Sequence, residues 1–173
     1  MRCRFPLAAV AIAVALPATA GAVVTKATIT PNRGANGITV GMTRAQVVAK
    51  LGKPLFANMN GFMEYGSKKA GVLFDVYVDG KSGRVRLLGL HGARFCLIGS
   101  GPCLEEQGGV GRLKARYGSA LKIVKLESGE PVARLTGTVR GCKVFTDFGA
   151  PISANPRARI GMTFIGFLSG AAC

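Results

Sequence analysis

A regular alternation of apolar and polar residues predicts a β-hairpin near the middle of the chain. Residues 71–78 (GVLFDVYV) form a strand with one buried side, residues 79–83 (DGKSG) form a turn, and residues 84–90 return. The first strand is expected to bury Val72, Phe74, Val76 and Val78 and to turn Leu73, Asp75 and Tyr77 to the other side. The return strand is expected to place Val85, Leu87 and Gly89 opposite Arg86, Leu88 and Leu90.

The hydrophobic period changes to that of a helix over residues 43–51. Thr43 is a suitable N-cap residue, and Gln46 stands three positions later, where it completes a capping box. Gly52 follows the last apolar residue, and Pro54 cannot continue a helix. A short helix whose two ends are both specified is therefore predicted here.

The same order, a helix followed by strands, recurs in the second half of the chain. A helical segment is predicted within residues 104–117 and ends at Gly118. Four strand-like segments follow it, at residues 121–126, 131–139, 143–148 and 159–168. We therefore predict an α+β fold of two tandem helix-plus-antiparallel-sheet repeats, residues 37–95 and 96–173, with the helices on one face of a sheet. The direct identity between the halves is weak, so chance similarity is the alternative explanation.

The opening of the first predicted repeat resembles a known family. Residues 41–47 (GMTRAQV) and 51–54 (LGKP) are similar to the G-M-T-x-x-x-V-x-x-x-L-G-x-P opening of SmpA/OmlA-like domains. The same helix in tandem resembles the secreted β-lactamase-inhibitor-protein fold, in which two repeats join into one concave sheet. The resemblance is specific over residues 37–54 and implies fold and export. No binding residue is carried over, because the chain lacks a lipoprotein cysteine and Trp and is strongly basic.

The first 22 residues are typical of a signal peptide. Arg2 and Arg4 precede an apolar run at residues 7–16, and small residues allow cleavage after Ala20 or Ala22. This run is about half as long as a membrane-spanning helix, so no transmembrane segment is expected in the mature chain. The protein is therefore predicted to be secreted or to lie in the cell envelope. The polar residues 23–36 are predicted to form a loose leader.

Four cysteines remain after such a signal peptide is removed: Cys96, Cys103, Cys142 and Cys173. An even number in an exported chain indicates disulfides. Three pairings are possible, and we favour the neighbours, 96 with 103 and 142 with 173, because mostly turn residues separate the first two. The spacing fits no usual zinc site, and neither a metal nor another cofactor is predicted.

Composition and charge restrict the function. The 173 residues include 23 Lys or Arg and 8 Asp or Glu, a formal net charge of +15, and 49% of them are hydrophobic. Such a chain is too apolar for a disordered basic tail. Its basic residues are not interleaved with aromatic ones, so no specific nucleic acid is expected. The charge favours attachment to anionic envelope polymers, and a generally basic surface is the simpler explanation.

Candidates for catalysis are few. His91 is the only histidine and is expected to be exposed at the end of its strand. Asp75 and Asp79 share a strand face, but they are about 13 Å apart, which is too far for a pair of glycosidase carboxylates. We therefore predict that the protein is not an enzyme.

The predicted function is that of an exported, non-catalytic binding or cell-envelope-associated protein that attaches to anionic envelope polymers. Its expected binding face is the exposed side of the hairpin, with Asp75, Tyr77, Arg84 and Arg86. The alternative is an inhibitor-like protein that binds a secreted enzyme through its sheet face.

Overall fold

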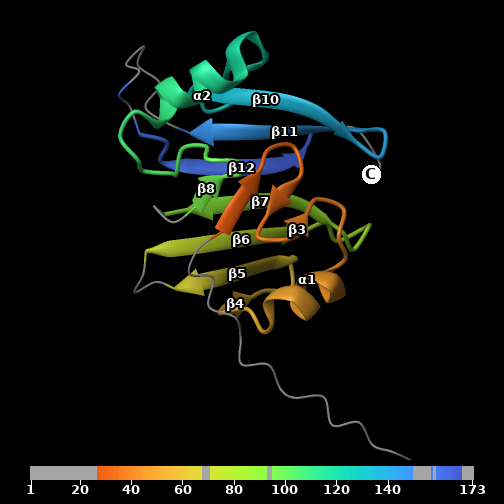
Figure 1. Ribbon diagram of the computed structural model, residues 1–173. Coiled ribbons are helices and arrows are strands. Elements are labelled where there is room, and N and C mark those ends of the chain that lie inside the picture. Colours follow the sequence, from red (N-terminus) through yellow and green to blue (C-terminus); the bar gives the residue numbers. More distant parts are fainter. Residues whose placement is uncertain (1–26, 68–70, 93–94, 150–156, 158, 169–173) are drawn as a thin grey trace, which may run out of the picture.

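The computed structural model describes residues 27–67, 71–92, 95–149, 157 and 159–168, which form two sheets and short helices (Figure 1). The large sheet consists, from one edge to the other, of β4 (Phe56–Ala57), β5 (Phe62–Ser67), β6 (Val72–Val78), β7 (Val85–His91), β12 (Met162–Phe167), β11 (Cys142–Gly149), β10 (Pro131–Val139) and β9 (Lys122–Lys125). The small sheet consists of β3 (Ile38–Thr39), β2 (Gly34–Ala35), β1 (Ala27–Thr30) and β8 (Phe95–Leu97). The helices are α1 (Arg44–Leu51), α2 (Gly109–Tyr117) and the 3-10 turn η2 (Gly118–Ala120).

The prediction of an α+β fold with two tandem helix-plus-antiparallel-sheet repeats is wrong. The structure is 48% strand and 16% helix, and one antiparallel sheet runs without interruption through both halves of the chain. β7 and β12 join in its middle, with Leu88 opposite Ile165 and Leu90 opposite Thr163. Two separate half-sheets would leave unpaired N–H and C=O groups along these two strands, and their pairing satisfies those groups. The predicted boundary between residues 95 and 96 falls inside β8.

Part of the predicted loose leader is regular structure. Residues 27–35 include β1 and β2, and β1 also pairs in parallel with β8. Ile29 and Ala35 are buried in the core, so this segment is held by packing as well as by backbone hydrogen bonds. The predicted signal peptide, residues 1–22, lies outside the described residues.

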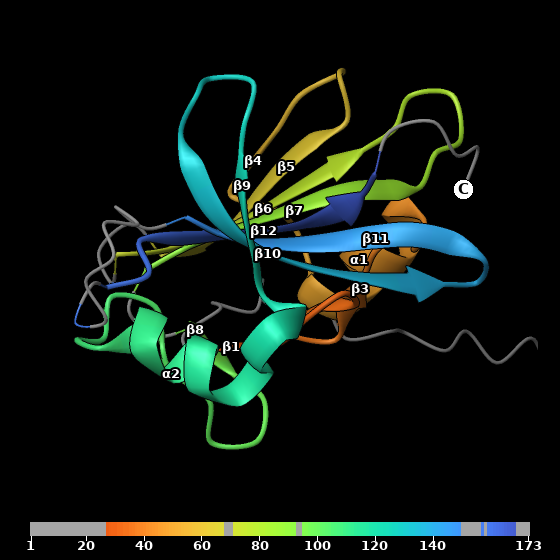
Figure 2. The same cartoon turned by 90° about the horizontal axis from the view of Figure 1, so that it is seen from above.

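Both helices and the small sheet lie on the same side of the large sheet (Figure 2). α1 forms where it is predicted: Thr43 Oγ1 accepts a hydrogen bond from the Gln46 N–H (3.3 Å), and Gln46 Oε1 accepts one from the Thr43 N–H (2.8 Å). α2 begins only after Gly108, whose left-handed conformation interrupts the predicted helical segment.

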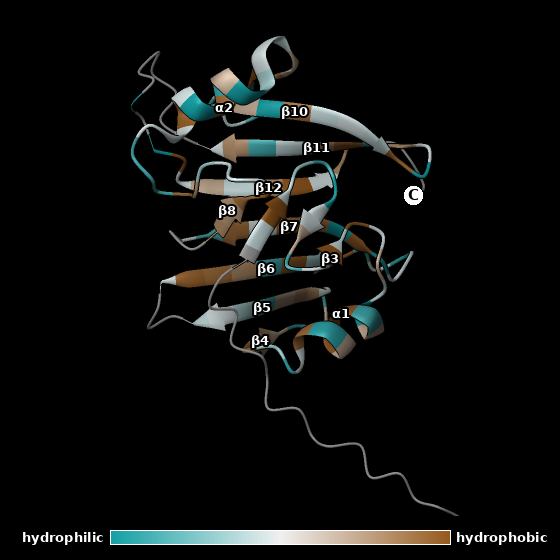
Figure 3. Cartoon of the chain, viewed as in Figure 1, coloured by the Kyte–Doolittle hydropathy of each residue, from teal (hydrophilic) through white to brown (hydrophobic). Residues whose placement is uncertain are grey.

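The core lies between the large sheet and the elements that cover it. Val47 of α1 and Leu113 of α2 are fully buried there, and the rings of Phe74 and Phe95 are 6.3 Å apart. Figure 3 shows mainly hydrophobic residues along β6, whereas α1 and α2 mix hydrophilic and hydrophobic residues. Each helix therefore contributes one apolar side to a single core.

The predicted hairpin forms from β6 and β7, with one change of register. β6 buries Val72, Phe74, Val76 and Val78, as predicted. The alternation predicted for the return strand is confirmed from Leu87 to Leu90, but the predicted side of Val85 is wrong. A bulge shifts the register between Tyr77, which pairs with Leu87, and Val78, which pairs with Val85. β7 consequently buries Val85, Leu88 and Leu90. Leu87, Gly89 and His91 lie on the side of Leu73, Asp75 and Tyr77.

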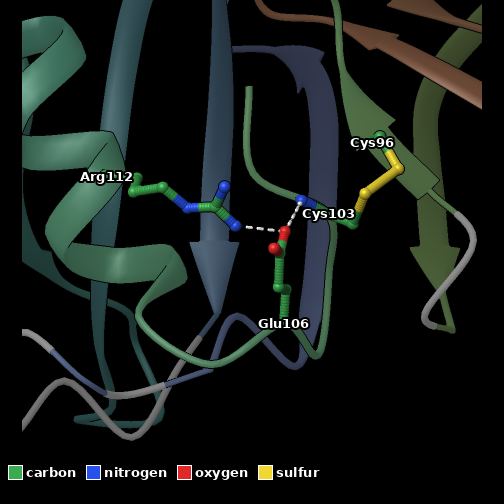
Figure 4. Close-up of a disulfide and its surroundings, with 4 residues drawn as sticks. All are labelled: Cys96, Cys103, Glu106 and Arg112. Atoms are coloured by element: carbon green, nitrogen blue, oxygen red, sulfur yellow. Dashed lines mark hydrogen bonds and ion pairs between the residues drawn. A yellow bond between two sulfur atoms is a disulfide. The ribbon is translucent and has the colours of Figure 1, made fainter. Parts of the chain in front are cut away.

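A disulfide joins Cys96 of β8 to Cys103, as predicted (Figure 4). The Glu106 carboxylate accepts a hydrogen bond from the Cys103 backbone N–H (3.0 Å) and forms an ion pair with Arg112 of α2. These two interactions, the backbone hydrogen bond first, lower the pKa of Glu106. Of the second predicted pair, Cys173 lies outside the described residues, and Cys142 takes part in a disulfide.

Replacing both Cys96 and Cys103 by serine is expected to lower the free energy of unfolding by about 2.5 kcal/mol, because the unfolded chain loses a short covalent loop. Urea denaturation of the oxidised protein measures this change. The double variant is preferable to a reductant, because a reductant also acts on the disulfide of Cys142. An unchanged midpoint with an unchanged slope would contradict the expectation.

Candidate functional site

Among the described residues, no helix or strand covers the second face of the large sheet (Figure 2). The hairpins at its two edges, β4–β5 and β9–β10, point toward this side, away from α1 and α2, so the face is concave. We call it the open face. Cross-strand pairing assigns to it Phe62 and Glu64 of β5, Leu73, Asp75 and Tyr77 of β6, Leu87, Gly89 and His91 of β7, Met162, Phe164 and Gly166 of β12, Phe145 and Asp147 of β11, and Arg134 and Thr136 of β10.

Two glycines at the centre of the open face make room for larger neighbours. A Cβ atom on Gly89 would lie 3.3 Å from Asp75 Cβ and 3.4 Å from the Phe164 ring. A Cβ atom on Gly166 would lie 2.8 Å from Leu87 Cδ1. Because glycine has no side chain, the neighbouring side chains can lie across the two central strands.

His91 and Asp75 form an ion pair on this face. His91 Nε2 is 3.5 Å from Asp75 Oδ2, and the exposed fractions of the two side chains are 34% and 14%. The His91 ring also meets the ring of Phe164 edge-on, with the centroids 6.2 Å apart. The expectation of an exposed strand-end histidine is therefore wrong: His91 is half-buried, and the Asp75 carboxylate raises its pKa against the opposing effect of burial.

A second ion pair lies on the other half of the face. Arg134 of β10 donates two hydrogen bonds to Asp147 of β11, from Nε to Oδ1 and from Nη2 to Oδ2, both 2.6 Å long. Asp147 is only 3% exposed, and the Arg134 guanidinium lies 5.0 Å from the centroid of the Phe145 ring. This two-point contact holds both side chains in one geometry.

Aromatic side chains follow one another from β4 to β6. The Phe56 and Phe62 rings are 6.0 Å apart, and the Phe62 and Tyr77 rings are 5.0 Å apart. Burial, and then the Asp75 charge, raise the pKa of the Tyr77 hydroxyl. Beyond Tyr77 lies a mainly apolar hollow of about 280 Å³, which Arg86, Leu87 and Phe145 also line.

The structure brings together three of the four residues predicted for the binding face. Asp75 and Tyr77 lie on the open face, and Arg86, the extra residue at the bulge, lines the hollow beside Tyr77. Arg84 does not belong to this group. It lines a separate cleft with Arg33 and Arg140, at the β3 and α1 side of the molecule.

Several residues of the open face escape prediction from the sequence, among them Phe145, Phe164, Arg134 and Asp147. These four come from the last three strands of the chain, whose pairing with the central hairpin is not visible in a local pattern. Alternation within residues 143–148 places Phe145 and Asp147 on one side of a strand, but it does not show which side is left uncovered.

Metal binding and nucleophilic catalysis each require a particular arrangement of side chains. The described residues contain no group of three or more His, Cys, Asp or Glu side chains placed to hold a metal ion. Within the described chain, the polar contact of the His91 ring is with Asp75, and no hydroxyl or thiol joins the pair to make a nucleophile. No helix among the described residues is long and apolar enough to cross a membrane.

Comparison with known proteins identifies no relative: no family model, no curated protein and no solved structure matches the chain. The resemblance of residues 37–54 to SmpA/OmlA-like domains and to the β-lactamase-inhibitor-protein fold therefore stays a prediction.

The pKa of His91 is expected to lie above its ordinary value of 6.5 in the folded protein. The raised pKa means that folding favours the charged form of His91, so the His91–Asp75 pair stabilises the protein below pH 6.5. This stabilisation disappears as the pH rises through the raised pKa of His91. Because the chain has one histidine, an NMR titration of its imidazole signals reports this group alone. Asp75→Asn should bring the pKa to 6.5 or below, because burial alone then acts; an unchanged pKa would contradict the pairing.

Asp147→Ala is expected to lower the free energy of unfolding by about 2 kcal/mol, because it leaves the Arg134 charge half-buried without its partner. Chemical denaturation measures the loss. The double variant Arg134→Leu, Asp147→Leu should regain most of it, because no unpaired charge is left. If the double variant were as unstable as Asp147→Ala, the loss would come from packing and not from the ion pair.

Proposed function

We propose that the protein is an exported, non-catalytic binding protein that receives a protein partner on the open face of its large sheet. The observation that supports this most directly is the one-sided cover of the sheet. The helices and the small sheet bury one face, whereas the other keeps half-buried aromatic rings in a concave surface. Interfaces between proteins are rich in such side chains, particularly Tyr, Phe and Met.

The side chains of the open face are also held in a fixed arrangement before a partner binds. The His91–Asp75 and Arg134–Asp147 pairs restrain its polar side chains, and the bulge at Tyr77 directs Arg86 to the same side. A surface ordered before association loses less conformational entropy when a partner binds.

The charge of the chain indicates the chemistry of the partner. Lys122 and Lys143 are exposed near the β9–β10–β11 side of the face, and Arg86 lines its hollow. With a formal net charge of +15, the protein should favour a partner whose contact surface is acidic at its rim. A secreted enzyme bound by an inhibitor-like protein, the alternative named above, is one partner of this kind.

Export is part of the same proposal. It is supported by the signal-like pattern of residues 1–22 and by the Cys96–Cys103 disulfide, since disulfides persist mainly in oxidising compartments.

Attachment to anionic envelope polymers remains the second candidate. It is favoured by the distribution of charge: the sequence contains no Asp or Glu before Glu64, while Arg33, Arg44, Lys50 and Lys53 precede it. Binding of this kind weakens steeply with salt, whereas a protein interface with an aromatic centre does not.

Tyr77→Ala is expected to lower the affinity for the protein partner at least about 10-fold, because the ring lies at the edge of the hollow. Val48→Ala serves as the matched control, because Val48 is exposed to the same extent, 38%, but lies on α1 behind the sheet. The oxidised protein is immobilised, and the envelope and secreted fractions are applied at low and at high salt.

A stoichiometric protein that is retained at high salt by the wild type and by Val48→Ala, but not by Tyr77→Ala, supports the proposal. Equal retention of the protein by both variants would show that the open face is not the binding surface. Retention of polyanions at low salt alone would favour the second candidate.

A further inference from the structure

We infer that the cleft lined by Arg33, Arg84 and Arg140 binds a phosphate group carried on a polymer. The cleft is separate from the open face, so this inference does not depend on the proposed protein partner. It gives the second candidate, attachment to an anionic polymer, a defined site on the molecule.

The cleft has a volume of about 460 Å³ and is built from segments that are distant in the sequence. Arg33 comes from the turn between β1 and β2, Arg84 from the turn before β7, and Arg140 from the turn between β10 and β11. Thr39, Gln46 and Thr138 are the neutral polar residues that also line it. One cleft is thus lined by three arginines that no local pattern of the sequence places together.

None of the residues that line the cleft is acidic. Asp75, Glu106 and Asp147 form ion pairs outside the cleft, with His91, Arg112 and Arg134 respectively. Three cations that line one cleft without a carboxylate repel each other, and an anion that enters the cleft removes this repulsion.

Two of the arginines are held in place by their surroundings. The Arg84 Nη1 donates a hydrogen bond to the Gly41 carbonyl oxygen (2.9 Å), and Arg84 also forms a β-bridge with Thr43. The turn that carries Arg33 is fastened to β11, because the backbone N–H of Asn32 donates to Thr146 Oγ1 (2.6 Å). The guanidinium groups are therefore presented from fixed backbone positions, which lowers the entropy lost on binding.

Arg140 stands at a position for which its residue type is unsuited. Val139 pairs with Cys142, so Arg140 and Gly141 form a two-residue hairpin turn, with φ of 51° and 82°. A turn with both central residues at positive φ favours Asn-Gly, and an arginine at its first position costs stability. Arg140 lines the cleft, and a ligand there would explain why an arginine occupies the turn.

The chemistry of the donors favours phosphate. Arginine presents several N–H groups in a planar fork that matches the oxygens of phosphate, and three arginines line this one cleft. The cleft is open to solvent, since all three arginines are exposed. A phosphate in it can therefore remain attached to a chain that continues outside.

The test uses the oxidised protein and polyphosphate as the probe, with titration calorimetry at low salt. The single variant Arg140→Asn is the sharpest, because Asn suits the turn and removes only the charge. It should weaken polyphosphate binding about 10-fold without lowering the melting temperature. The triple variant Arg33→Gln, Arg84→Gln, Arg140→Asn should abolish the binding.

The matched control is Lys53→Gln, Lys81→Gln, Lys114→Gln, which removes the same charge from exposed positions outside the cleft. It should keep most of the affinity, and so should Tyr77→Ala. Equal losses in the two triple variants would show that net charge alone binds the polyanion and would overturn the inference. Equal binding of polyglutamate at the same charge would overturn the selectivity for phosphate.

Inorganic phosphate distinguishes the two sources of the ligand. Displacement of polyphosphate by inorganic phosphate only at far higher concentration supports the polymer as ligand. Displacement at equal phosphate concentration would overturn the inference that the phosphate is carried on a polymer, and the cleft would then be a site for the free anion.

Discussion

The antiparallel pairing of β7 with β12 is the interaction on which the rest of the structure depends. It joins strands that are more than seventy residues apart in the sequence through backbone hydrogen bonds along five residue pairs. Without it, each half of the chain would expose a strand edge with unpaired amide and carbonyl groups, which is a site for association with other chains. With it, the described strands form one sheet of eight, whose two edge strands are the short β4 and β9.

This pairing also creates the two faces of the molecule. A sheet of this width needs cover on one side to bury its apolar residues, and α1, α2 and the small sheet provide it. The other side is left open and combines residues of both halves, with Asp75 and His91 from the central hairpin beside Phe164 of β12. The candidate protein interface thus results directly from the pairing of the two central strands, β7 and β12.

The basic residues are distributed over the surface differently from the aromatic residues of the open face. The net charge of +15 belongs to the whole chain and identifies no site. Most of the basic residues are exposed and spread over several elements, whereas Arg33, Arg84 and Arg140 meet where three turns come together. Their separation from the open face divides the surface into an aromatic part, suited to a protein, and a cationic part, suited to an anion.

The sequence by itself determined the features that depend on neighbours along the chain. Helix α1 follows from Thr43 and Gln46 at its start and Gly52 at its end, and the buried side of β6 follows from strict alternation. The Cys96–Cys103 disulfide follows from a short spacing of turn residues. Asp75 and Tyr77 are placed correctly for the same reason, since both lie on a strand with an unbroken period of two.

Only the tertiary structure decided which strands pair, which face stays open and which arginines meet. Because of a one-residue bulge, Leu87 lies on the open face and Leu88 in the core. Arg86 consequently lies beside Tyr77, whereas Arg84 lines another cleft. Residues 27–30, at the start of a segment rich in turn formers, became strand β1 because β8 offered an edge to pair with. Local periodicity contains no information about such partners, because hydrogen bonds between distant strands depend on the fold of the whole chain.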